Sequence, residues 1–152
     1  MISEVAIERV LDRLSGGGED FAQDLSDFGE AQPFLLNYLT QEDTEAFTQP
    51  EQELLLFAAV VVYQSILEER SEPAQIQGEA IAKREEVYYQ LLQDQAKGQF
   101  ADRISIFFEQ SQEEELLAFI EDLLSPDDDS PVSTEAREAM FVSLATVVGV
   151  LS

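Results

Sequence analysis

The chain contains neither histidine nor cysteine, and this narrows the chemistry that its side chains can perform. Histidine is the commonest general base near neutral pH and the commonest metal ligand. Cysteine supplies nucleophilic thiolates, disulfides and the sulfur ligands of zinc and iron–sulfur sites. Only carboxylates, hydroxyls, lysine and arginine remain. We therefore expect a non-catalytic protein without a catalytic residue, a metal site or a cofactor.

Three features of the sequence contain residue types that could bind a ligand or take part in catalysis. Asp127–Asp129 offers oxygen ligands of the kind that Ca²⁺ and Mg²⁺ take, but it lacks the alternating spacing and glycine of an EF-hand and indicates a solvated loop. Gly16–Gly18 lacks the phosphate-loop pattern and follows a predicted helix, so it indicates a connector. Serine–lysine catalysis would need Lys83 or Lys97, both on predicted helix surfaces. A hydrolase that binds a divalent metal through carboxylates alone stays an alternative.

Two pairs of adjacent aromatic residues are candidates for contact with a partner. Tyrosine is enriched at protein interfaces, and Tyr88 and Tyr89 follow one another. We expect Tyr88 in the core and Tyr89 partly exposed. Phe107 and Phe108 cannot both point into one narrow apolar stripe. The sequence therefore predicts Tyr89 and Phe108 as partner-contact residues.

The charge of the chain is strongly acidic. It has 32 Asp and Glu against 8 Lys and Arg, a net charge of −24 and a pI near 4.1. This field repels nucleic acids and anionic membranes and attracts basic proteins. We expect a protein partner, with the chain acting as an adaptor, inhibitor or small regulatory subunit. An acidic mimic or immunity-type protein that blocks a basic surface is the alternative, and solubility and salt adaptation also explain the charge.

Neither a secretion signal nor a membrane span is predicted. The first residues lack a basic region followed by a long apolar run. The longest nearly apolar stretch, 54–63, has about half of the ~20 residues that cross a bilayer. We expect a cytoplasmic protein that does not bind membranes, and the sequence leaves open a monomer or a homodimer.

Apolar residues recur with helical spacing along the whole chain, as Ile7, Val10, Leu11 and Leu14 illustrate. The pattern predicts an all-α fold: one compact domain over 1–152 with about seven to nine helices. The predicted helices cover 3–14, 21–28 with a stop at Gly29, a segment that begins at Pro33, 50–70, 75–97 with a stop at Gly98, 100–108, 116–124 and 133–151.

Two of these helices are apolar on every face. Thr48, Pro50 and Glu51 form a capping-box start for helix 50–70, whose middle consists of apolar residues. Ser133 is the expected cap of helix 133–151, where Gly149 suggests a close backbone approach at a helix crossing. Both helices are expected to be buried all round.

The helix predicted over 75–97 is amphipathic instead. Its expected buried stripe consists of Ile76, Ala80, Val87 and Leu91, with Tyr88 and Leu92 beside it. Glu79 and Lys83 are expected to pair across one turn on the exposed side.

The two halves of the chain resemble each other. Phe21 matches Phe100 and Phe57 matches Phe141, with two small gaps in predicted loops between the matched segments. We interpret this as an internal duplication with repeat units 1–70 and 76–152 joined by linker 71–75. The units would be two similar four-helix units related by a pseudo-two-fold axis, with helices 50–70 and 133–151 meeting at the centre.

Overall fold

The computed structural model describes residues 2–15, 18–40, 47–96, 98–124 and 134–151, and within these it contains only α-helices. This confirms the all-α prediction, and the number of helices lies in the predicted range. The eight helices are α1 (Glu4–Ser15), α2 (Gly18–Ala31), α3 (Pro33–Leu39), α4 (Gln49–Glu69), α5 (Gly78–Gln93), α6 (Phe100–Gln110), α7 (Glu114–Leu124) and α8 (Thr134–Leu151).

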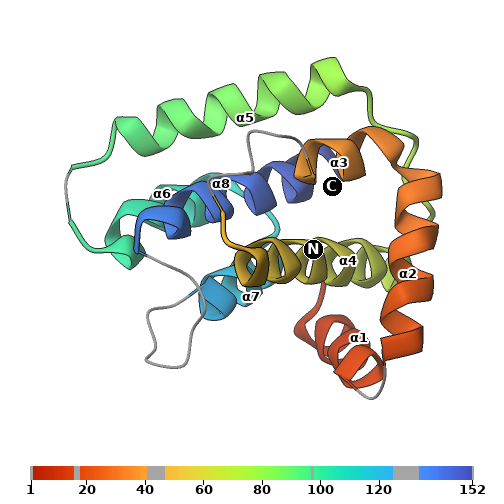
Figure 1. The fold of residues 1–152 in the computed structure, drawn as a ribbon. Helices are drawn as coiled ribbons and strands as arrows, with labels where there is room; N and C mark the ends of the chain where they lie inside the picture. Colours follow the sequence, from red (N-terminus) through yellow and green to blue (C-terminus); the bar gives the residue numbers. More distant parts are fainter. Residues whose placement is uncertain (1, 16–17, 41–46, 97, 125–133, 152) are drawn as a thin grey trace.

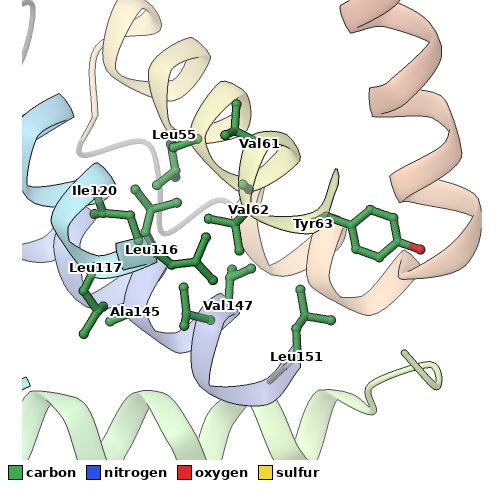
Figure 2. Close-up of a cluster of buried hydrophobic side chains, with 14 of the residues drawn as sticks. Leu55, Val61, Val62, Tyr63, Leu116, Leu117, Ile120, Ala145, Val147 and Leu151 are labelled. Carbon is green, nitrogen blue, oxygen red and sulfur yellow. The ribbon is translucent and has the colours of Figure 1, made fainter. Parts of the chain in front are cut away.

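Helices α4 and α8 contact one another in the centre of the molecule (Figure 1). Each has apolar residues around its circumference, as its sequence predicted, so each can be covered from several sides. In α4 the run from Ala58 to Tyr63 is buried, and in α8 the run from Met140 to Val142 is buried. Figure 2 shows side chains of α4, α7 and α8 meeting in one cluster.

The other helices surround this pair in a partly symmetric way. Helix α1 packs along α4 as α5 packs along α8, and α3 contacts α5 as α7 contacts α1. The aromatic residues that the two halves share are also placed alike: Phe21 lies 5.9 Å from Phe57, and Phe100 lies 5.9 Å from Phe141, between ring centroids. These contacts agree with the proposed duplication, which stays a prediction.

The start of α4 follows the predicted capping box. The Glu51 N–H donates to Thr48 Oγ1 at 3.3 Å, and the Thr48 N–H donates to Glu51 Oε1 at 2.8 Å. Pro33 occupies the first turn of α3, as expected. Gly29 does not end a helix, because α2 continues to Ala31 and stops only where Pro33 disfavours a helical conformation of the preceding residue.

Helix α5 is shorter than predicted and buries a different face. It begins at Gly78 because residues 73–76 are held by Gln32 of the α2–α3 connection. The Gln32 side-chain amide donates to the carbonyls of Pro73 and Ala74, and its oxygen accepts the Ile76 N–H at 2.8 Å. These hydrogen bonds replace those of an additional helical turn.

The predicted buried stripe of α5 is partly wrong. Ala80 and Val87 are exposed, while Ile81 and Leu92 are buried against the core. The helix ends at Gln93, well before Gly98. The predicted ion pair is present on its outer side, with Lys83 Nζ 3.4 Å from Glu79 Oε1.

Some predictions fall outside the described residues. These are most of the glycine connector (Gly16 and Gly17), Lys97, the acidic loop Asp127–Asp129 and the Ser133 cap. Over the part of the chain that is described, none of the helices has both the length and the apolar character needed to cross a bilayer.

Candidate protein-binding cleft

A surface cleft of about 110 Å³ lies where α5 packs over α8, next to α6 and α7. We call it the α5 cleft. Apolar groups make up slightly more than half of its wall, and polar groups make up the rest. The lining residues are Arg84, Val87, Tyr88 and Leu91 of α5, Phe107 and Gln110 of α6, Ser111, Leu117 of α7, and Ala145 and Val148 of α8.

Small residues on α8 create the floor of the cleft. Ala145 lines the cleft with a single methyl group, and Gly149 allows side chains of α5 to approach closely. A Cβ atom on Gly149 would lie 2.6 Å from Tyr88 Oη and 3.2 Å from Arg84 Cδ. The close approach predicted at Gly149 is therefore present, but it is made by side chains of α5 and not by its backbone. Leu117 and Ala145, which line the cleft, also belong to the buried cluster shown in Figure 2.

Val87 marks the mouth of the cleft. Its side chain is 52% exposed, so it adds apolar surface at the edge of the cleft. Ile81 and Leu92 of the same helix are buried, and α5 contacts both α8 and α3. Leu91, one turn further along, is only partly buried. The mouth is therefore apolar and open to solvent.

Aromatic contacts fix the inner wall of the cleft. The Tyr88 ring meets the Phe107 ring edge to face, with centroids 5.3 Å apart. Phe107 in turn packs against Phe141 of α8 at 5.2 Å. On its other side, the Tyr88 ring lies 5.8 Å from the guanidinium carbon of Arg84, within the range of a cation–π interaction. This wall is preorganised before any ligand arrives.

A second contact holds the position of α5 from the side of α3. The hydroxyl of Tyr38 donates to the Glu85 carboxylate, and Ser143 and Thr146 of α8 lie next to it. Burial, followed by the hydrogen bond to Glu85, raises the pKa of Tyr38 well above its usual value. The phenol therefore stays protonated and keeps its hydrogen bond at any pH near neutrality.

The two predicted partner-contact residues do not line the cleft. Tyr89 is half-buried on the flank of α5, where burial and then the Glu85 charge raise its pKa. Phe108 is partly buried against the core. Their immediate neighbours in the sequence, Tyr88 and Phe107, line the cleft instead. A role for Tyr89 and Phe108 in partner contact stays a prediction, made at a surface different from the cleft.

The cleft contains residues that sequence reasoning did not select. Arg84, Val87, Tyr88 and Leu91 have the i, i+3, i+4, i+7 spacing of one helix face. This spacing was a usable signal for a solvent-accessible site. A helix face that is fully covered by the core would be expected to carry apolar residues only, and this face contains an arginine.

Two features of the described residues bear on the metal-dependent and serine–lysine alternatives. No group of three or more carboxylates among them lies close enough together to hold a metal ion. Lys83 is one of the two lysines that serine–lysine catalysis could use. It pairs with Glu79 on the outside of α5, and both side chains are largely exposed.

Comparisons of the chain with protein-family models, with curated proteins and with solved structures found no match. The cleft is therefore interpreted from its own geometry and charge.

Proposed function

We propose that this protein is a non-catalytic helical interaction protein that binds a protein partner by taking one partner side chain into the α5 cleft. In this role it would act as an adaptor, an inhibitor or a small regulatory subunit. The observation that carries the proposal is the size of the cleft together with the exposure of Val87 at its mouth.

The volume of the cleft favours a side chain over a small-molecule substrate. Pockets for substrates and cofactors usually have about 300–1,000 Å³. A cavity of about 150 Å³ in another protein holds a single benzene molecule. The α5 cleft, at about 110 Å³, matches one branched aliphatic side chain.

The construction of the cleft also resembles an interface anchor site. Binding energy at protein interfaces is concentrated in a few side chains that fill well-packed, desolvated pockets. Tyr88 and Phe107 provide a rigid aromatic wall of this type, and Val87 provides apolar surface that a partner would cover. The cleft therefore needs no rearrangement to accept an anchor.

The charge of the molecule supports a basic partner. A net charge of −24 accelerates encounter with basic proteins and slows encounter with acidic ones. The field would act mainly on the association rate, and the cleft mainly on the lifetime of the complex. An acidic mimic would use the charge alone and would not need the cleft.

The proposal is tested by affinity capture from a lysate of the source cell with the wild-type protein and two matched variants. Val87→Lys places a charge at the mouth of the cleft. Val5→Lys makes the same change at a 59% exposed valine on α1, which is not part of the cleft. We expect a partner that is retained by wild type and Val5→Lys at moderate salt and lost from Val87→Lys, with mass spectrometry as the readout.

Two outcomes would contradict the proposal. Partners that bind Val87→Lys as well as wild type and dissociate at high salt would indicate an acidic mimic. Absence of any partner whose capture depends on Val87 would rule out the cleft as the binding site.

A further inference from the structure

The charge at the mouth of the α5 cleft differs from that of the rest of the molecule. Five other basic side chains among the described residues are paired with carboxylates. These ion pairs are Arg9 with Glu68, Arg13 with Asp24, Arg70 with Glu113, Lys83 with Glu79 and Arg103 with Glu138. Arg137 is buried and donates to the carbonyl of Leu124.

Arg84 does not follow this pattern. No carboxylate of the described residues lies within ion-pair distance of its guanidinium, and no described oxygen accepts a hydrogen bond from it. Acidic residues outnumber basic ones fourfold in this chain, so an arginine that forms no ion pair with the described residues is unexpected.

Packing holds Arg84 in place at the wall of the cleft. Its Cγ and Cδ atoms lie over Gly149, and its guanidinium carbon is 5.8 Å from the Tyr88 ring centroid. A guanidinium that stacks on an aromatic face keeps its in-plane N–H groups available for a planar acceptor. The Arg84 side chain therefore loses less conformational entropy when it binds a carboxylate than a freely moving arginine would lose.

A single residue of a partner can satisfy both features of the cleft. A C-terminal residue carries its side chain and the terminal carboxylate on the same carbon atom. A branched aliphatic side chain would fill the apolar cavity, and the carboxylate would reach the guanidinium beside it and accept two parallel hydrogen bonds.

The charge around the cleft specifies the rest of the partner chain. Exposed carboxylates adjoin lining residues on two helices, since Glu86 precedes Val87 and Glu109 precedes Gln110. The net charge of −24 repels an isolated anion. Basic residues that precede the terminal residue in the partner would be attracted to these carboxylates. The terminal carboxylate of the partner could then bind Arg84.

We infer that the α5 cleft binds the C-terminus of a basic protein chain, with a branched aliphatic last residue in the cavity and its terminal carboxylate on Arg84. This inference rests on the proposed function and defines its partner: a basic tail that ends in leucine, isoleucine or valine.

The test uses fluorescein-labelled octapeptides with four N-terminal lysines, three varied residues and a C-terminal leucine. Each peptide is made as the free acid, as the C-terminal amide and with glycine in place of leucine. Binding is measured by fluorescence anisotropy in about 0.15 M NaCl, where the Debye length is about 8 Å. We expect the best free acids to bind at least about tenfold more tightly than their amides, a difference of about 1.4 kcal/mol.

Two variants with the same change in net charge separate a local role of Arg84 from the general field. Arg84→Gln is expected to remove the difference between acid and amide. Arg9→Gln removes another exposed arginine, which lies on α1 and pairs with Glu68, and it is expected to preserve the difference between acid and amide.

The outcomes distinguish failure of the inference from failure of the proposed function. Equal binding of acid and amide, or equal effects of Arg84→Gln and Arg9→Gln, would overturn the assignment of the carboxylate to Arg84. If leucine-to-glycine exchange and Val87→Lys still weakened binding in that case, the cleft would remain an anchor site for an internal segment. If no peptide bound in a leucine-dependent way, both proposals would fail.

Discussion

Individual side chains decide how closely α5 can approach α8. Gly149 has no Cβ, and Tyr88 and Arg84 occupy the space that this leaves. The Tyr88 ring cannot easily move away, because Phe107 lies against it. The shape of the cleft therefore depends on one glycine and on the tyrosine hydroxyl that packs on it.

The substitution Gly149→Ala is expected to destabilise the protein. The new Cβ would lie 2.6 Å from Tyr88 Oη. Crowding of this type costs about 1–3 kcal/mol, offset by up to about 1 kcal/mol of helix propensity, so we expect a net loss near 1 kcal/mol. The measurement is the free energy of unfolding in urea.

A second background provides the control for this prediction. In Tyr88→Phe the closest atom is absent and only the flexible Arg84 side chain, 3.2 Å from the new Cβ, must still shift, so Gly149→Ala should there cost much less or nothing. Gly78→Ala, at a position with open space around it, should stabilise α5 by up to about 1 kcal/mol. A loss that persists in the Tyr88→Phe background would show that the hydroxyl is not the cause.

Buried tyrosines predict a loss of stability at alkaline pH. Burial, and then the neighbouring Glu72 charge, raises the pKa of Tyr63 to about 12, against about 10 in an unfolded chain. The folded state therefore retains a proton that the unfolded state has lost. The stability that Tyr63 contributes is complete below pH ~10 and decreases as the pH rises toward 12, by up to about 1.4 kcal/mol per pH unit.

The comparison that tests this is urea unfolding of wild type and Tyr63→Phe at about pH 9 and pH 11. Wild type should lose more free energy of unfolding over this interval than the variant, since phenylalanine does not titrate. Parallel losses in both proteins would show that lysines or other groups cause the alkaline effect.

At the scale of elements, the positions where helices begin have specific causes. Helix α4 begins at a capping box that local sequence specifies. Helix α5 begins just after the segment that is hydrogen-bonded to Gln32, a residue more than 40 positions earlier. Both starts matter for function, since α4 forms the core and α5 carries the cleft.

Removal of the α4 cap should lower the stability of the whole protein. Thr48→Ala removes the oxygen that accepts the Glu51 N–H, a change that typically costs about 1 kcal/mol. For a chain of this length we expect the melting temperature to fall by about 2–4 °C. Thr48→Ser keeps the acceptor and should restore most of the loss. An unchanged melting temperature in Thr48→Ala would show that core packing alone specifies the start of α4.

Removal of the Gln32 side-chain amide should loosen the segment before α5. Gln32→Leu eliminates the hydrogen bonds to Pro73, Ala74 and Ile76, each worth about 0.5–1.5 kcal/mol. We expect faster proteolysis within 71–77 and a lower free energy of unfolding. Cleavage at an unchanged rate would mean that packing of Ile76 holds the segment without Gln32.

At the scale of the whole molecule, charge opposes folding while the core supports it. The net charge of −24 is carried by a protein of 152 residues, and its described basic residues are largely paired already. Self-repulsion of the remaining carboxylates should destabilise the compact state when little salt is present. The same field would attract the basic partner that we propose.

The melting temperature at pH 7 should therefore rise when NaCl is increased from a few millimolar to about 0.1 M, where the Debye length falls to about 10 Å. A melting temperature that stayed constant or fell would show that the carboxylates are spaced widely enough for repulsion not to matter. Differential scanning calorimetry provides the measurement.

Local patterns determined the helical content, the buried central pair and the capped start of α4, because the period of apolar residues and the capping residues act within a few positions of one another. Tertiary structure alone decided which flank of α5 is covered. Val87 and Ile81 are both aliphatic residues in α5, yet one is exposed and the other buried.

The reason is that exposure depends on the neighbours a helix meets, and these come from distant parts of the chain. The hydrogen bonds of Gln32 hold the residues before α5 outside the helix. The lack of a side chain at Gly149 allows Tyr88 of α5 to pack closely on α8. The same packing left Arg84 beside an open apolar cavity and without an acidic partner among the described residues. The helical spacing of the α5 residues indicates that they share one face, but the sequence does not show whether that face is covered, since the groups that enclose the cleft belong to four helices.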